Sequence, residues 1–95
     1  MSVYLDPMVD YGKRIGRAGP LWCHVIADSE GELRAMARHL GLINYIHGDA
    51  PRHFNIGTER VRALAIAAGA IECDRRTFVG HMRRIRKFTS EQKES

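Results

Sequence analysis

The segment Leu21–Ala27 is an almost uninterrupted apolar run, and a helix start signal follows it directly. Continuous apolar runs of this length are typical of strands that are covered on both faces of a sheet. Ser29, followed three residues later by Glu32, has the pattern of a capping box, which begins a helix. A buried strand that leads directly into a helix predicts an α/β domain with helices packed on a mainly parallel sheet.

Length and local signals predict one small domain. A chain of 95 residues has room for a single hydrophobic core, so we expect one compact domain over residues 1–88 and a flexible polar tail over residues 89–95. Apolar spacing indicates about four to five short strands, at residues 2–6, 21–27, 42–46, 53–56 and 70–73. It also indicates three helices, at residues 29–40, 58–68 and 75–87, and a long loop at residues 7–20.

The composition narrows the cellular setting and the kinds of partner. No stretch approaches the ~18 apolar residues of a membrane-spanning helix, so we expect no membrane partner. Cys23 and Cys73 are too few for a disulfide framework, which favours a reducing, cytoplasmic location. A domain of this size buries little apolar surface, and a homodimer is compatible with that.

Aspartates follow three of the predicted strands. Asp6, Asp28 and Asp74 stand at strand ends, where ligands of open α/β sheets gather. Carboxylates at such a place can hold a divalent metal ion, which could activate water for phosphodiester hydrolysis. Asp28 and Asp74 also stand where helix caps belong, so capping is an alternative role for both.

Two histidines lie near the same strand ends. His24 interrupts the apolar run, and His53 precedes the second helix at the matching distance. If their strands are neighbours, Asp6, His24 and His53 form one cluster that could bind a metal ion or serve as acid and base near neutral pH. These three are the candidate catalytic and metal-ligating residues. A histidine among apolar residues is also commonly a hydrogen-bonded core residue, and no zinc-ligand spacing is present.

The net charge of +4 is concentrated in the third predicted helix. No acidic residue lies between Asp74 and Thr89, and six cations do: Arg75, Arg76, Arg83, Arg84, Arg86 and Lys87. Arginine side chains match phosphate oxygens, so the helix is a candidate surface for a nucleic-acid backbone. An acidic protein partner would fit the same charge.

Further cations lie in the predicted long loop. Lys13, Arg14 and Arg17 stand among glycines, and free backbone amides with positive side chains can hold a phosphate group. The spacing matches no known phosphate-binding fingerprint. Together with Asp28, these three cations are the candidate ligand-binding residues.

Four segments have a familiar order: VYLDP at residues 3–7, WCHVIAD at 22–28, HFNI at 53–56 and ALAIAAGA at 63–70. They resemble DUF4031, a family of small bacterial and phage proteins of unknown function. The family's Tyr-x-Asp start matches Tyr4 and Asp6, and its Cys-His pair before Ile-Ala-Asp matches residues 23–28. Its His-aromatic-Asp matches residues 53–55, with Asn55 in place of the aspartate. The resemblance implies no established activity.

Three functions compete at this point. The first is a binding module for a phosphate-bearing ligand or nucleic acid, in bacterial or phage DNA metabolism. The second is a small metal-assisted hydrolase of phosphodiesters that uses the Asp/His cluster. The third is a phage protein that binds a host factor. The sequence leaves open whether the protein is an enzyme.

Overall fold

A sheet of mixed strand direction organises the fold. The computed structural model describes residues 2–12, 19–49 and 51–94, and within them the chain forms five strands, three α-helices and one short 3-10 helix. The strands are β1 (Val3–Leu5), β2 (Val9–Asp10), β3 (Leu21–Ala27), β4 (Phe54–Ile56) and β5 (Ile71–Glu72). The helices are α1 (Glu30–His39), η1 (Ile43–Tyr45), α2 (Glu59–Ala67) and α3 (Arg75–Glu94).

The prediction of a mainly parallel sheet was wrong. β3 is the hub of the sheet, and it pairs antiparallel with β1, β2 and β4. The described part of the sheet has one parallel pair, β1 with β5. The reason lies in the connection after α1, where a backbone bridge between His47 and His53 reverses the chain. β4 therefore enters the sheet in the opposite direction to β3, although a helix separates them in sequence.

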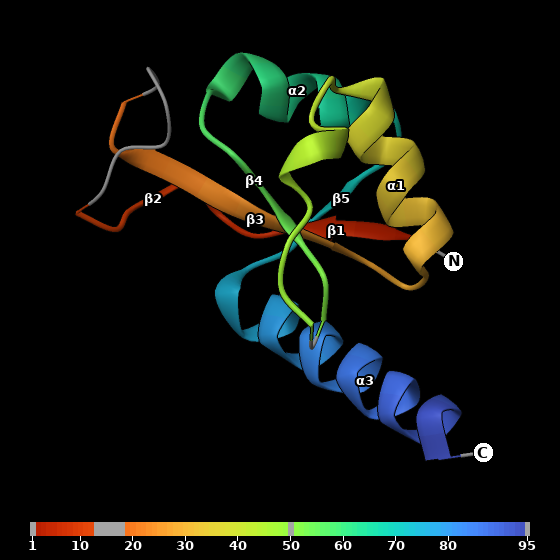
Figure 1. Cartoon of the computed structure of the whole chain (residues 1–95). Coiled ribbons are helices and arrows are strands. Elements are labelled where there is room, and N and C mark those ends of the chain that lie inside the picture. The colour runs from red at the N-terminus through yellow and green to blue at the C-terminus, as the bar shows by residue number, and fades with distance from the viewer. Residues whose placement is uncertain (1, 13–18, 50, 95) are drawn as a thin grey trace.

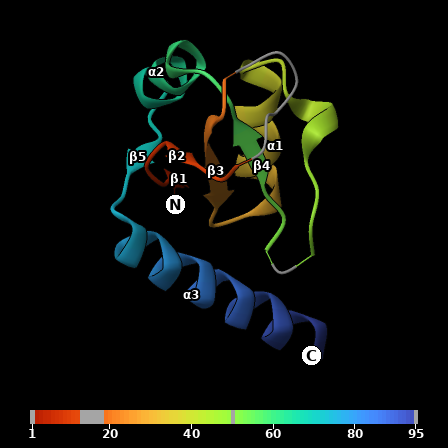
Figure 2. The same ribbon diagram turned by 90° about the vertical axis from the view of Figure 1, so that its left-hand side faces the viewer.

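The sheet lies between two helical layers, with α1 and α2 on one side and α3 on the other (Figure 1), and the view turned by 90° shows α3 crossing below the strands (Figure 2). Alternate residues of β3 serve the two layers. Cys23, Val25 and Ala27 belong to the larger core, which also contains residues of α1 and α2. Ile26 belongs to a second core with residues of α3. By the same alternation, His24 faces α3.

The helix starts confirm the predicted caps. Ser29 Oγ accepts the N–H of Glu32 and donates to Oε1 of the same residue, so the two residues of the predicted capping box bond to each other. Thr58 caps α2 through Val61, and Asp74 caps α3 through the N–H of Thr77 at 2.7 Å. The helix α3 continues to Glu94, beyond the predicted end at residue 87.

The predicted strand at residues 42–46 was wrong, because this segment contains the 3-10 helix η1. Leu42, Ile43 and Ile46 still pack on the larger core. A short apolar run of this length fits a strand or a helical turn equally well. No helix in the described part of the chain is long and apolar enough to cross a membrane.

Candidate functional site

Asp6 and His24 form a close pair at the end of β1. Asp6 is 1% exposed, and its Oδ2 atom lies 2.9 Å from Nδ1 of His24. Its Oδ1 atom accepts the backbone N–H of His24 at 2.6 Å. With the carboxylate as the acceptor, Nδ1 of His24 is the donor of this hydrogen bond. The Nε2 atom is then the ring nitrogen that is available to a ligand, and the His24 side chain is 27% exposed.

One extra residue between β1 and β2 turns Asp6 toward β3. From Leu5 to Val9 the chain advances four residues, whereas their partners Val25 and Trp22 are three residues apart. A one-residue excess of this kind is a β-bulge, which bends the strand and re-aims a side chain. The bulge explains how Asp6 can accept two hydrogen bonds from one residue of the neighbouring strand.

Arg62 of α2 contacts the backbone of Asp6 from the other side of the sheet. Its Nη2 donates to the backbone carbonyl of Asp6 at 3.2 Å, and its Nη1 donates to Oε1 of Glu72 at 2.9 Å. The Arg62 side chain is 14% exposed. The guanidinium therefore ties α2, β1 and β5 together at the residue that orients His24.

His53 lies just before β4, and its ring faces the His24 ring with 6.1 Å between the centroids. Nδ1 of His53 lies 3.1 Å from the carbonyl oxygen of Pro51, which can only accept, so this nitrogen donates. The ring of His47 is 4.2 Å from the ring of His53. Burial lowers the pKa of His53, and charge on His47 and His24 lowers it further, against the Pro51 hydrogen bond.

These residues open onto one pocket between the sheet and α3, with a volume of about 90 Å³. Asp6, His24 and His53 line it together with Arg75, the first residue of α3. The remaining wall is mostly apolar and consists of Ile26, Phe78, Val79 and Met82. Apolar walls with a few convergent polar groups are typical of ligand sites. The structure thus brings the three predicted cluster residues together and adds one cation of the basic helix.

The pocket does not have the geometry of a metal centre. Among the described residues, no group of three or more His, Cys, Asp or Glu side chains could hold a metal ion. Asp6 uses both carboxylate oxygens on His24, and His53 uses Nδ1 on Pro51. The arrangement instead resembles the carboxylate–imidazole pairs that move protons, in which the carboxylate fixes the tautomer and orientation of the ring.

Asp28 does not join this cluster. Since β1 and β3 are antiparallel, Asp28 lies at the other end of the pair, where it accepts the backbone N–H of Ser2 at 2.8 Å. Its carboxylate also accepts the Tyr4 hydroxyl and Nη2 of Arg84, the latter at 2.8 Å. The His81 ring stacks on Tyr4 at 3.9 Å. Asp28 and Arg84 therefore attach α3 to the sheet.

The cations of the predicted basic helix have different surroundings in the structure. Arg75 lines the pocket and donates to the Tyr11 hydroxyl at 2.7 Å. Arg84 is paired with Asp28, and its side chain is 52% exposed. The residues that face solvent on α3 include further predicted phosphate contacts: Arg76, Arg83, Arg86 and Lys87. Asp74 lies at the start of the helix as its cap.

Part of the predicted loop at residues 7–20 is a strand, because β2 pairs with β3 through Val9 and Asp10. Asp10 then accepts the backbone N–H of Gly12 at 2.8 Å. The cations predicted to hold phosphate in this loop lie outside the described residues and remain a prediction: Lys13, Arg14 and Arg17.

Sequence reasoning missed two aromatic residues beside the pocket. The Tyr11 and Trp22 rings lie 4.3 Å apart, and their centroids are 5.5 Å and 5.0 Å from that of His24. Trp22 lies two residues before His24 on β3, so the two side chains are on the same face of the strand. This alternation could have predicted that Trp22 lies beside His24. Tyr11 carried no comparable signal, because it lies just after a two-residue strand within an apparent loop.

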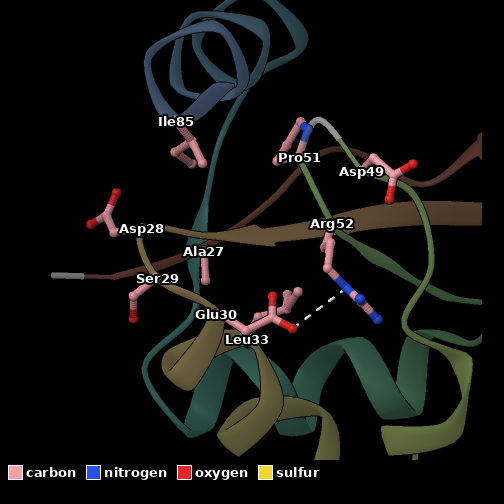
Figure 3. Close-up of a pocket in the computed structure, with 9 residues that line it drawn as sticks. All are labelled: Ala27, Asp28, Ser29, Glu30, Leu33, Asp49, Pro51, Arg52 and Ile85. Atoms are coloured by element: carbon pink, nitrogen blue, oxygen red, sulfur yellow. Dashed lines mark ion pairs between the residues drawn. The ribbon is translucent and has the colours of Figure 1, made fainter. Parts of the chain in front are cut away.

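A second hollow, of about 320 Å³, is lined by the start of α1, by Asp49, Pro51 and Arg52, and by Ile85 of α3 (Figure 3). Its polar lining includes Asp28, Glu30 and Arg52. Glu30 and Arg52 form an ion pair at 3.4 Å, drawn as a dashed line, and Asp28 is bound to Arg84. The paired charges of this hollow are thus Glu30 with Arg52 and Asp28 with Arg84, whereas the smaller pocket contains the two imidazoles.

The comparison with known proteins identifies a family and no activity. A family model described as a protein of unknown function, DUF4031, matches residues 3–85 of the 95-residue chain. No curated protein and no solved structure matches the chain. The matched residues include every residue that lines the Asp6–His24 pocket. The chain belongs to the DUF4031 family.

Proposed function

We propose that the protein binds a phosphate group of a nucleotide or nucleic acid in the pocket lined by Asp6, His24, His53 and Arg75. One observation carries the proposal: the side chain of Arg75 and two imidazole rings line a single small pocket. A guanidinium group donates in a fork that matches phosphate oxygens, and imidazoles can add donors or exchange a proton.

Two features of α3 favour an anionic ligand. The pocket lies along the first two turns of a 20-residue helix, from Arg75 to Met82, near the end at which the helix dipole favours negative charge. Arg76, Arg83 and Lys87 share one side of this helix by their spacing and are exposed. A polynucleotide with one phosphate in the pocket could place neighbouring phosphates along that side.

The free thiols Cys23 and Cys73 fit the reducing, cytoplasmic setting in which such a ligand is abundant. Nucleic-acid metabolism of bacteria or their phages is the process that we propose for this binding. A host protein as the partner is the alternative prediction.

Trp22 offers a direct assay, because it is the single tryptophan of the chain and its ring is 5.0 Å from that of His24. A short 5′-phosphorylated oligonucleotide is titrated at low salt while Trp22 fluorescence is recorded. We expect saturable binding that weakens as salt is added. We expect Arg75→Gln to weaken it about tenfold, the loss of one charged hydrogen bond.

Arg76→Gln is the matched control, because Arg76 is the next residue of the same helix and does not line the pocket. It should change the affinity far less than Arg75→Gln. Absence of saturable binding by the wild-type protein would contradict the proposal. Equal losses in the two variants would also contradict it, since they would indicate general attraction to the helix rather than a site.

A further inference from the structure

The two imidazoles of the pocket present the same nitrogen. Nδ1 of His24 is held by the Asp6 carboxylate at 2.9 Å, and Nδ1 of His53 is held by the Pro51 carbonyl at 3.1 Å. Both partners accept hydrogen bonds, so each neutral ring has its lone pair on Nε2. Either ring can therefore take a proton at Nε2 or, once protonated, release one there.

Resting on the proposed phosphate site, we propose that the pocket cleaves RNA without a metal ion. Nε2 of His24 takes the proton of a ribose 2′-hydroxyl group, and protonated His53 gives its Nε2 proton to the leaving 5′-oxygen. Arg75 neutralises charge on the phosphate oxygens during the transfer. Asp6 faces the positive charge that His24 gains, as the carboxylate does in other carboxylate–imidazole pairs.

The step balances within the substrate and the two histidines. The bond from the 2′-oxygen to phosphorus forms, and the bond from phosphorus to the 5′-oxygen breaks. The products are a 2′,3′-cyclic phosphate and a free 5′-hydroxyl group. His24 ends protonated and His53 ends neutral, and exchange with water restores both states. No oxidant, reductant or second substrate takes part.

The groups that line the pocket favour RNA over DNA as the substrate. The residues of the pocket supply a base, an acid and a cation, and they offer no set of ligands for an ion that would activate water. An adjacent 2′-hydroxyl needs no such activation, because intramolecular attack corresponds to effective concentrations of roughly 10⁵–10⁸ M. DNA lacks this nucleophile.

The surroundings of the two rings support their separate roles. Asp6 of the β1 end faces His24, whereas His53 is surrounded by His47, His24 and the α3 cation Arg75 that lines the same pocket. Burial and the two neighbouring histidines lower the pKa of His53. A lowered pKa makes charged His53 a stronger acid but leaves less of it charged at neutral pH, so cleavage should be faster below neutral pH.

The test is cleavage of a single-stranded RNA oligonucleotide in the presence of EDTA, with product masses measured. The matched substrate is the DNA oligonucleotide of the same sequence. We expect a 2′,3′-cyclic phosphate product from RNA, no cleavage of DNA, and a bell-shaped dependence of the rate on pH. His24→Asn and His53→Asn should each lower the rate about 100-fold or more.

The asparagine variants are chosen because the side-chain amide can replace the Nδ1 donor toward Asp6 or Pro51 while it removes Nε2. Circular dichroism checks their folding, and if His24→Asn does not fold, His53→Asn alone decides. His39→Asn is the control, since His39 ends α1 in the opposite helical layer, and it should keep the wild-type rate.

Two outcomes separate this inference from the proposed function. If RNA quenches Trp22 fluorescence saturably but is not cleaved, or if cleavage needs added Mg²⁺, RNA cleavage by the two histidines is overturned and the phosphate site stands. If the DNA oligonucleotide binds and RNA does not, only the RNA inference is overturned, and if neither binds, both are overturned. Equal cleavage of the DNA oligonucleotide would overturn the assignment of the 2′-hydroxyl as nucleophile.

Discussion

Replacement of Gly48 by alanine tests how the pocket holds His53. Gly48 has a φ of +82°, in the left-handed region that costs an alanine about 1–2 kcal/mol. A Cβ atom at this position would lie 2.7 Å from Cε1 and 2.9 Å from Nδ1 of His53. Both distances are too short for a packed structure, so the His53 ring or the backbone must move.

Gly41→Ala is the matched control. Gly41 has a φ of +75°, and a Cβ atom there would have nothing within 4 Å. Gly41→Ala should therefore lose only the backbone cost of about 1–2 kcal/mol. The free energy of unfolding of Gly48→Ala should fall by roughly a further 1–3 kcal/mol if the ring stays in place, which is the cost of overpacking. It should fall by about a further 1 kcal/mol if the His53 ring rotates away and loses its hydrogen bond to Pro51.

Urea unfolding gives the free energies of unfolding of the two variants, and the Trp22 titration gives their affinities for the oligonucleotide. We expect Gly48→Ala to be the less stable variant and to bind more weakly, because His53 leaves its position in the pocket. Gly41→Ala should bind like the wild type. Equal free energies with wild-type binding in both variants would refute the placement of His53 against Gly48.

Three further predictions address the attachment of α3, the core thiol and metal ions. Asp28→Ala should lower the free energy of unfolding in urea by about 2 kcal/mol. Arg84→Gln should lower it by under about 1 kcal/mol, because the Arg84 side chain is half exposed. Burial acts to raise the pKa of Asp28, but hydrogen bonds from Arg84, the Ser2 backbone and the Tyr4 hydroxyl outweigh it and lower the pKa. The stability that ionised Asp28 contributes is present above about pH 4 and is lost as the pH falls through its pKa in the folded protein. Asp28→Asn should therefore make the free energy of unfolding less dependent on pH in the acid range. An unchanged dependence would contradict the hydrogen bonds assigned to Asp28. Burial raises the pKa of Cys23 to about 11, so the native thiol should react with a disulfide reagent at least about 100-fold more slowly than in urea, and a fast native reaction would contradict its burial. Dialysis against EDTA should leave the oligonucleotide affinity within about twofold, because the described residues hold no group of metal ligands, and a large loss would show that such a group exists.

Local signals predicted most of the elements of this fold. The apolar run Leu21–Ala27 and the caps Ser29, Thr58 and Asp74 indicated β3 and the three helix starts. These features depend on residues close in sequence, so they can be recognised without tertiary contacts. Strand direction cannot be recognised from neighbouring residues alone, because it depends on where the chain reverses between His47 and His53.

The proximity of Asp6, His24 and His53 was expected from strand ends that were thought to be parallel. The structure brings them together for a different reason, which is that the end of β1 pairs with the middle of the antiparallel strand β3 and a bulge turns Asp6 inward. The same antiparallel pairing carries Asp28 to the far end. Arg62 was missed because a single arginine in a helix has no local pattern that reveals its hydrogen bond to the Asp6 carbonyl.

Titration of the wild-type protein with inorganic phosphate, followed by NMR of the histidine ring protons, tests the central claim most directly. We expect the signals of His24 and His53 to shift together and saturate, while the signal of His39 does not move. The proposed phosphate site would be contradicted if the signals of His24 and His53 stayed unchanged while signals of residues outside the pocket shifted and saturated.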